Sequence, residues 1–441
     1  MSTPSAKEPR KKRILFKCAL TNTISDVLAN REGWAPTQND DWNFFWVTRE
    51  WMTNCYDKHK FNDKQLICHF RNDFELTRKD FLIKNYKKAR KAKEKSGIDV
   101  ANEFSFVPSS YVLPTEYHLF VEEFRKYPSD TIWIMKPVAG AQGKGIFLFR
   151  KLKHVQDWKK KDATGSEALP YVVQSYVANP YLVGGKKFDV RIYVLVTSFR
   201  PLNVWVHREG FARFSHSRYS TDSVDDAFVH LTNVAVAKTA ADYDPERGLK
   251  WSLPKLFRFF RSMHGHLKVS KMMEDLAKVI IESLRSVHHI IIQDAHCFEL
   301  YGYDILFDEH LKPWLLEVNA SPSLTASSQE DFELKYRVLN HMLDVLDIEK
   351  KLTGGETEIG GFDILVRNNK PVEKNRMPNH NNSNFIPTLN LRLAEDTKKT
   401  RKEEEEDEEL RYPTIRRREE DEEQKKGAEL EGLFALIFAH L

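Results

Sequence analysis

The sequence predicts a mixed fold of the α/β (α+β) class. Short runs of β-branched and aromatic residues follow Phe106 and read as buried strands. They are TIWIMKP (131–137), GIFLFR (145–150), PYVVQSYV (170–177), VRIYVLVTSF (190–199) and NVWVHREGFARF (203–214). Helical patterns separate these runs, notably at 115–127 and, over a longer amphipathic stretch, at 268–288. A strand pair at 302–319 and a final helix ending near Lys350 complete the predicted architecture.

Length and composition suggest several domains followed by a charged tail. A chain of 441 residues is long enough for two or three domains. We expect a flexible basic lead at 1–13, an N-terminal domain at 14–105, a central domain at 106–180 and a C-terminal domain at 181–350. Residues 351–441 turn rich in Asn, Gly and Pro and then in blocks such as KKTRKEEEEDEE. We therefore expect this last segment to be a disordered, low-complexity charged tail.

The overall charge and the cysteines narrow the function classes. A formal net charge of +4 is too small to give the whole protein a positive field that would attract nucleic acid. No apolar stretch approaches the roughly 20 residues of a membrane helix. The four cysteines lie far apart without a CxxC pair, which argues against a zinc site or a disulfide framework. We expect a cytoplasmic protein without a signal peptide. The basic run 84–95 suits an acidic protein tail, a membrane surface or RNA, or is simply a solvated helix face.

The predicted hairpin carries a candidate metal site. Glu317 and Asn319 lie two residues apart on one strand and therefore on one face. A turn centred at 310–311 places Asp304 directly opposite Glu317. Three side chains with hard oxygen atoms then converge, as Mg²⁺ with bound phosphates requires. The alternative is a solvent-facing polar side of the hairpin, but the apolar neighbours on both faces make unligated carboxylates costly.

Two further segments are candidates for binding phosphate. In WIMKPVAGAQGKGI (133–146), Lys136 ends a strand and glycines follow, so that backbone N–H groups can approach phosphate oxygens. The segment is neither a Walker loop nor a GxGxxG fingerprint, and an ordinary hairpin turn also explains it. In GGKKFDVRIYVLV (184–196), Lys187, Asp189 and Arg191 alternate with apolar residues. Two cations beside one anion suggest added negative charge such as phosphate, although a surface ladder of salt bridges remains possible.

Weaker signals complete the set of candidate residues. VVQSYV (172–177) offers backbone groups and Tyr176 to a purine ring. Arg213 adds a cation, and HLTN (230–233) adds a hydroxyl and an amide near the strands. Each of these features also has a purely structural interpretation.

The order of these motifs along the chain resembles that in the ATP-grasp ligases, and their residue sequences resemble those of the tubulin tyrosine ligase-like family. The similar segments are DWNFFW (41–46), ELTRKD (75–80), KFDVRIYVLV (187–196), HLTN (230–233) and YGYDILFDEHLKPWLLEVNASPSL (301–324). The resemblance covers about residues 25–345 and implies an ATP-grasp fold with ATP between the central and C-terminal domains. It implies ATP contacts from Lys136, Gln142, Gly143, Gln174, Ser175, Tyr176, Val177, Lys187, Asp189, Thr232 and Asn233. It further implies Mg²⁺ ligation by Asp304, Glu317 and Asn319, and catalytic roles for Arg191 and Arg213.

Within that family the chain looks most similar to the short polyglutamylase-type members. This implies ligation of L-glutamate to glutamate side chains in the acidic C-terminal tails of tubulin, through an acyl phosphate, with the basic N-terminal surface facing the tail. It also implies a place on microtubules of the cytoskeleton, in the cilium or flagellum axoneme and basal body, and possible partner subunits. Three alternatives stay open: glycine addition by the same chemistry, an amide ligase acting on small peptides, and a non-catalytic scaffold subunit of a ciliary tubulin-modifying complex.

Overall fold

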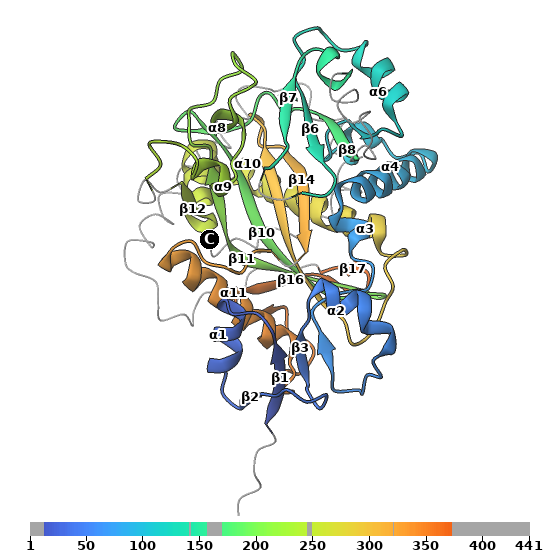
Figure 1. Cartoon of the computed structure of the whole chain (residues 1–441), viewed down its shortest axis with the longest axis vertical. Helices are drawn as coiled ribbons and strands as arrows, with labels where there is room; N and C mark the ends of the chain where they lie inside the picture. Colours follow the sequence, from blue (N-terminus) through green and yellow to red (C-terminus); the bar gives the residue numbers. More distant parts are fainter. Residues whose placement is uncertain (1–12, 141–142, 157–169, 245–248, 321, 373–441) are drawn as a thin grey trace, which may run out of the picture. The chain divides into compact units, whose positions relative to one another are not determined.

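The computed structural model of the chain describes residues 13–140, 143–156, 170–244, 249–320 and 322–372. It contains three sheets with helices between them, which confirms the α/β (α+β) class (Figure 1). Apart from Arg13, the predicted basic lead lies outside the described residues. No helix of the described part is both long and apolar enough to cross a membrane.

The first sheet has four strands in the order β2-β1-β3-β4, and all its neighbours run parallel. Helical segments join β1 to β2 and β3 to β4, the two pairs of successive strands that lie side by side in parallel. The side chains of Asn22 and Thr48 begin two of these helices by accepting hydrogen bonds from the N–H groups of Ile24 and Trp51. The elements are β1 (Ile14–Cys18), α1 (Thr23–Asn30), β2 (Trp34–Pro36), β3 (Phe44–Trp46), α2 (Arg49–Asn54), η1 (Tyr56–Lys58) and β4 (Leu66–Ile67).

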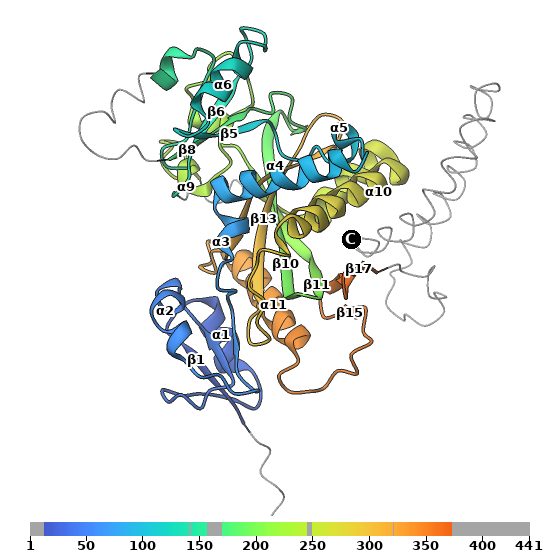
Figure 2. The same cartoon turned by 90° about the vertical axis from the view of Figure 1, so that its right-hand side faces the viewer.

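Three helices follow this sheet: α3 (Phe74–Thr77), α4 (Lys79–Lys95) and α5 (Val100–Glu103). The basic run 84–95 lies within α4, which runs alongside the long helix α10 (Leu253–Val287) in Figure 2. Helix α4 also contacts β5 and β8 of the next sheet.

The central sheet is antiparallel, with the order β5-β8-β6-β7. Helix α6 covers one face, where Phe120 packs edge-on against Trp133 with ring centroids 5.2 Å apart. The strands predicted at 131–137, 145–150 and 170–177 correspond to β6, β7 and β8. The elements are β5 (Ser110–Leu113), α6 (Tyr117–Phe124), β6 (Trp133–Pro137), β7 (Phe147–Phe149) and β8 (Tyr171–Ser175).

The largest sheet has nine strands and follows the path β14-β13-β10-β11-β16-β15. Strands β9 and β12 pair with β10 and β11 beside this path. Its strands are β9 (Leu182–Val183), β10 (Lys186–Phe199), β11 (Leu202–Phe214), β12 (Lys250–Ser252), β13 (Glu299–Phe307), β14 (Pro313–Ala320), β15 (Glu358–Ile359), β16 (Phe362–Arg367) and β17 (Lys370–Pro371). Besides α10, the helices are α8 (Ala227–His230), α9 (Val234–Ala237) and α11 (Gln329–Leu346).

Helix α10 extends further than the predicted 268–288. It begins at Leu253, and Gly265 interrupts it with φ 73° and ψ 169°, so two helical halves meet at a kink. Glycine adopts this left-handed φ without the steric cost that a Cβ would add. The amphipathic pattern predicted only the second half.

The prediction that the tail begins at residue 351 is wrong for residues 358–371. Strand β16 pairs with β11 through Val204↔Val366, Trp205↔Ile364 and His207↔Phe362. Phe362, Leu365 and Val366 are buried, and Arg208 forms an ion pair with the buried Asp363. The apolar run FDILV is short and lies among Gly and Asn residues. Composition alone therefore does not reveal that this segment forms a strand of the largest sheet. Residues 373–441 lie outside the described part of the chain.

The predicted divisions at 105 and 180 stay predictions. The chain up to Lys370 groups into one compact unit. Two sets of contacts tie the first sheet to the rest of this unit. Arg31 donates hydrogen bonds to Asp344 and Glu349, and His69 lies 2.8 Å from the buried carboxylate of Glu299 in β13.

Candidate active site

One cavity of about 590 Å³ gathers the candidate residues. This volume lies in the range usual for pockets that hold small ligands. Strands of the central and largest sheets, the glycine segment after β6 and the turn before α9 all contribute to its wall. The predicted site residues that line it are Lys136, Gly143, Gln174, Ser175, Tyr176, Val177, Lys187, Asp189, Arg191, Arg213, Thr232, Asn233, Asp304, Glu317 and Asn319. The remaining predicted residue, Gln142, lies outside the described residues.

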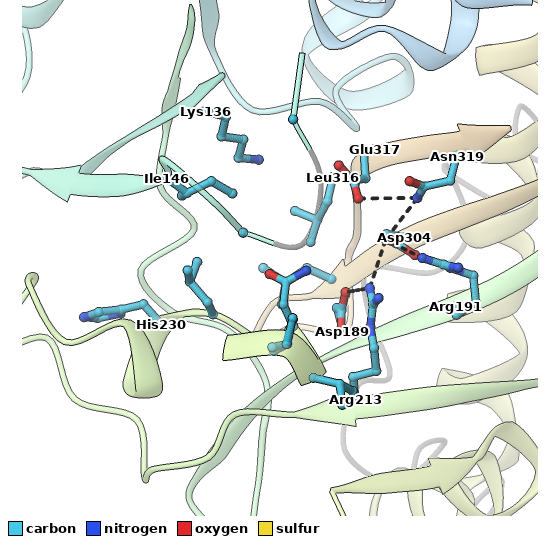
Figure 3. Close-up of a pocket in the computed structure, with 18 of the residues that line it drawn as sticks. Lys136, Ile146, Asp189, Arg191, Arg213, His230, Asp304, Leu316, Glu317 and Asn319 are labelled. Carbon is cyan, nitrogen blue, oxygen red and sulfur yellow. Dashed lines mark hydrogen bonds and ion pairs between the residues drawn. The ribbon is translucent and has the colours of Figure 1, made fainter. Parts of the chain in front are cut away.

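The hairpin places the two carboxylates as the sequence predicts. Asp304 of β13 pairs directly with Glu317 of β14, but the next pair is Ile305 with Leu315. One residue of β14, Leu316, is therefore a β-bulge without an opposite partner. Such a bulge re-aims side chains beside it, and Leu316 points into the cavity (Figure 3).

Asn319 links the two carboxylates. Its Nδ2 atom donates to Asp304 Oδ2 at 3.2 Å and to Glu317 Oε1 at 3.4 Å (Figure 3). The other oxygen of Glu317, Oε2, lies 3.0 Å from Nζ of Lys79, the first residue of α4. Two carboxylates and an amide on one face form a donor set that suits a hard divalent cation, and Lys79 supplies a positive charge to the same face.

Two arginines hold Asp304 in its ionised form. Arg191 donates Nε–H to Asp304 Oδ1 at 2.5 Å and Nη2–H to Oδ2 at 3.0 Å. Arg213 lies 2.9 Å from Oδ2 and also forms a two-point ion pair with Asp189. Burial alone opposes ionisation of Asp304, but the charges of Arg191 and Arg213 outweigh it and hold its pKa well below the usual range.

Both guanidinium groups keep donors for a ligand. Their bonds to Asp189 and Asp304 use Nε and Nη2. Among the described residues, neither Nη1 group donates a hydrogen bond to a protein acceptor. Because arginine carries five N–H donors, each side chain is fixed by its carboxylate and still presents charge and donors to the cavity.

Lys136 lies on the other side of the cavity, held by a chain of polar groups (Figure 3). Its Nζ donates to Gln174 Oε1 at 2.8 Å, and Gln174 Nε2 donates to Ser110 Oγ at 2.9 Å. Burial lowers the pKa of Lys136 to about 8, with Glu317 opposing and Lys79 adding to this shift. A buried lysine without a carboxylate at contact distance is prepared for an anionic ligand.

Lys187 ends a second chain of hydrogen bonds. Its Nζ donates to Tyr176 Oη at 3.0 Å and to the His230 carbonyl at 2.9 Å. The Tyr176 hydroxyl lies 3.0 Å from His230 Nδ1, and His230 Nε2 lies 2.7 Å from the Ser223 carbonyl. Because a carbonyl only accepts, Nε2 carries the proton and Nδ1 accepts from Tyr176. Burial, and next the charge of Lys136, lower the pKa of Lys187 to about 7.

Two glycines bring backbone close to the site. Gly143 has φ 79°, and a Cβ there would lie 3.0 Å from Asn233 Oδ1. This close approach lets the glycine segment lie against the turn that carries Asn233. A Cβ at Gly302 in β13 would lie 3.0 Å from Cδ of Arg191, so glycine leaves room for the arginine that binds Asp304.

The cavity wall beside Arg213 holds a charged group that the sequence did not reveal. Lys250 Nζ lies 2.9 Å from Ser327 Oγ and 3.3 Å from Asp331 Oδ1. Lys335 binds the other oxygen of Asp331 at 3.0 Å. The Lys335 side chain is 6% exposed and that of Lys250 is 26% exposed. Two cations therefore share one carboxylate, and the surplus positive charge lies on the more accessible Lys250.

Sequence analysis missed several residues of the cavity for different reasons. His230 and Lys79 lie inside motifs that drew attention, HLTN and ELTRKD, but their partners Tyr176 and Glu317 lie far away in the sequence. Lys250 lies on a three-residue strand without a recognisable pattern. Only pairing of distant strands reveals such residues.

Comparisons with known proteins find similarity over most of the chain. A sequence model of the tubulin-tyrosine ligase family matches residues 57–353. A Caenorhabditis elegans protein described as probable tubulin polyglutamylase ttll-9 is 83% identical over 90% of this chain and 95% of its own length. A mouse protein described as probable tubulin polyglutamylase TTLL9 is 47% identical over 88% and 91%. A Tetrahymena thermophila protein described as probable alpha-tubulin polyglutamylase Ttll1 is 40% identical over 82% and 93%.

Proposed function

The chain belongs to the tubulin-tyrosine ligase family, and from this we propose that it is a tubulin polyglutamylase. It is an ATP-dependent ligase that joins L-glutamate to glutamate side chains in the acidic tails of tubulin. A protein that modifies tubulin works on the cytoskeleton in the cytoplasm, and our proposal extends this place of action to the microtubules of cilia or flagella.

One observation carries the proposal. A single cavity combines two buried lysines, two arginines anchored by carboxylates, and a face formed by Asp304, Glu317 and Asn319. Lysines at one side suit the phosphates of ATP, and the carboxylate–amide face suits the cation that accompanies them. The arginines lie next to that face, where an acceptor carboxylate must meet the γ-phosphate. The relatives described as polyglutamylases support glutamate as the amino acid.

The first chemical step makes the acceptor carboxylate reactive. One oxygen of an acceptor glutamate attacks the γ-phosphorus of ATP, the bond to the β-phosphate oxygen breaks, and an acyl phosphate and ADP result. Lys136 and Lys187 hold the phosphates and offset their charge, while Arg191 and Arg213 direct Nη1–H donors at the acceptor. Asp304, Glu317 and Asn319 would hold Mg²⁺, which would neutralise phosphate charge as the γ-phosphoryl group moves.

The second step forms the amide. The neutral amine of free glutamate attacks the acyl carbon and a tetrahedral oxyanion forms. Its collapse breaks the bond to the phosphate oxygen, leaves the new amide bond, and expels phosphate, which takes the proton that the amine loses. The oxyanion develops next to the same arginine donors that held the acceptor carboxylate. Lys250, which pairs with Arg213 across β12 and β11, offers its charge to the side-chain carboxylate of the incoming glutamate. An uncharged side chain, such as that of glycine, provides no partner for such a surplus cation.

Mass spectrometry tests the proposed function. The purified chain is incubated with microtubules, ATP, Mg²⁺, glutamate and glycine, and the tubulin tails are then analysed. We expect glutamyl additions on glutamate side chains that require ATP. If glycine is added instead, the chain is a glycine ligase and not a polyglutamylase. If no addition occurs even in the presence of ciliary extract, which supplies any partner subunits, the chain has no ligase activity of its own.

A further inference from the structure

Helix α4 sorts its lysines onto two different faces. One face packs into the protein through the buried residues Leu82, Ile83 and Tyr86. Two lysines beside this face have internal partners. Lys87 binds Glu116 at 2.9 Å, and Lys93 binds Glu282 of α10 at 3.0 Å. These two cations are therefore part of the packing of α4 against its neighbours.

Lys79, the first residue of the helix, pairs with Glu317. The opposite face carries the remaining four lysines, Lys84, Lys88, Lys91 and Lys95, which we name the α4 lysine stripe. All four are exposed. Their spacing of four, three and four residues places them along one line of the helix, which spans about 16 Å at 1.5 Å per residue. In the part of the chain that the structure describes, none of the four forms an ion pair. Their charges are thus available to a partner.

The stripe leads away from the candidate active site. Helix α4 begins at Lys79, whose Nζ lies 3.0 Å from Glu317 Oε2 on the carboxylate face of the cavity. Lys84 follows about one and a half turns later and Lys95 lies near the far end of the helix. An extended peptide advances about 3.3 Å per residue, so about five residues of a peptide leaving the cavity could lie along the stripe.

We propose that the α4 lysine stripe binds the acidic residues that flank the acceptor glutamate in the substrate tail. This inference rests on the proposed function. The match is one of charge and shape: an extended acidic peptide presents a line of carboxylates, and the stripe presents a line of exposed ammonium groups. Single-stranded nucleic acid would need several exposed aromatic rings for base stacking, whereas among the described residues the stripe lysines lie over one ring, that of Phe81 at the Lys84 end. Lysines held by Glu116 and Glu282 lie outside this surface.

The test compares three sets of substitutions in the full chain. In the first, Lys84, Lys88, Lys91 and Lys95 are all changed to glutamine. In the second, the same four become arginine, which keeps the charge. In the third, four exposed lysines outside the cavity, Lys58, Lys60, Lys64 and Lys268, become glutamine and remove the same net charge.

The measurement is glutamate incorporation into microtubules at low and moderate salt. We expect the glutamine stripe variant to raise KM for microtubules about tenfold or more at low salt, with kcat and KM for ATP unchanged, and this difference should shrink as salt screens the charges. The arginine variant and the third set should stay within about twofold of the unsubstituted chain.

An unchanged KM in the glutamine stripe variant would overturn the inference, as would an equal rise in the third set. A loss of binding to single-stranded RNA with no change for microtubules would assign the stripe to a different partner. The activity of the unsubstituted chain at saturating microtubules is measured in the same experiment. If that activity is absent even with ciliary extract, the proposed function fails; if it is present and KM does not move, only the stripe proposal fails.

Discussion

Arg191 and Asp304 face each other on neighbouring strands and form a two-point ion pair, with Nε–Oδ1 at 2.5 Å and Nη2–Oδ2 at 3.0 Å. The two residues are separated by 113 positions in the sequence. Asp304 thus has two functions in the proposed site: it orients a catalytic arginine and belongs to the face that would hold Mg²⁺. Glu317, directly opposite it, is more exposed, and among the described residues its side chain is bound by Asn319 and Lys79 alone.

This difference predicts that the two carboxylates respond differently to substitution. Glu317→Gln should lower kcat at least about a hundredfold because it removes a proposed metal ligand, while the melting temperature changes little. Its side chain is 27% exposed, and only the pair with Lys79 is lost. Labelled-glutamate incorporation and thermal unfolding check both parts. The control is Glu309→Gln, in the exposed turn of the same hairpin, which should leave activity unchanged. Near-normal activity of Glu317→Gln would refute the assignment of Glu317 as a metal ligand.

Asp304→Asn should instead destabilise the fold. Removing the carboxylate leaves the buried Arg191 without its partner and Arg213 with only Asp189, and an uncompensated buried charge typically costs about 3–5 kcal/mol. Chemical denaturation measures the change in the free energy of unfolding. A variant that unfolds at the same denaturant concentration as the unsubstituted chain would show that the arginines do not depend on Asp304.

Binding of ATP should take up protons at pH 8. The pKa of Lys136 is about 8 and that of Lys187 is about 7, so Lys187 is mostly neutral at pH 8 without ligand. Phosphate oxygens favour the ammonium form and raise both pKa values on binding. Calorimetry of ATP binding in buffers of different ionisation enthalpy measures this proton uptake. At pH 8 the Lys187→Met variant should take up about one proton less than the unsubstituted chain when ATP binds. At pH 6 the two proteins should differ little, because Lys187 is already charged there.

The same lysine predicts how stability depends on pH in the absence of ATP. The folded pKa of Lys187 is lowered below the unfolded value of about 10.4, so the unfolded chain binds more protons between these two values. The contribution of Lys187 to the free energy of unfolding therefore rises from pH 7 towards pH 10. Comparison with Lys187→Met isolates it, and identical pH profiles of the two proteins would contradict it.

Lys250→Met should raise KM for glutamate more than KM for ATP. Lys250 is the more accessible of two cations that share Asp331, and it lines the cavity beside Arg213. We expect an increase of about tenfold, since a charge-assisted hydrogen bond contributes about 1.5–3 kcal/mol. Lys255→Met, an exposed lysine outside the cavity, serves as the control. Equal effects on both substrates would indicate a general disturbance of the site.

A truncation after residue 351 should impair folding, whereas one after residue 372 should not. The shorter chain loses β16, whose Phe362, Leu365 and Val366 are buried, and leaves β11 with an unpaired edge. Every described residue of the cavity lies before residue 336. Soluble yield and thermal unfolding of the two truncated chains provide the comparison. Equal stability would mean that β16 contributes nothing to the sheet.

The sequence by itself determined the local patterns of the site. Side chains of a strand alternate between two faces, so the spacing of Lys187, Asp189 and Arg191 placed all three on one face, and the hairpin length placed Asp304 opposite Glu317. These features depend only on the geometry of one strand or one turn. For the same reason the strands around the glycine segment were predicted close to their observed bounds.

Only the tertiary structure decided which groups act on one another. The ion pairs of Arg191 and Arg213, the contact of Lys79 with Glu317 and the addition of β16 to β11 join residues that lie far apart in the sequence. In α4 the sequence shows only a run of lysines, and packing against Glu116 and Glu282 separates Lys87 and Lys93 from the exposed stripe. A local pattern fixes the direction of a side chain, whereas its partner is set by the packing of distant segments, because burial and charge pairing depend on every element that surrounds it.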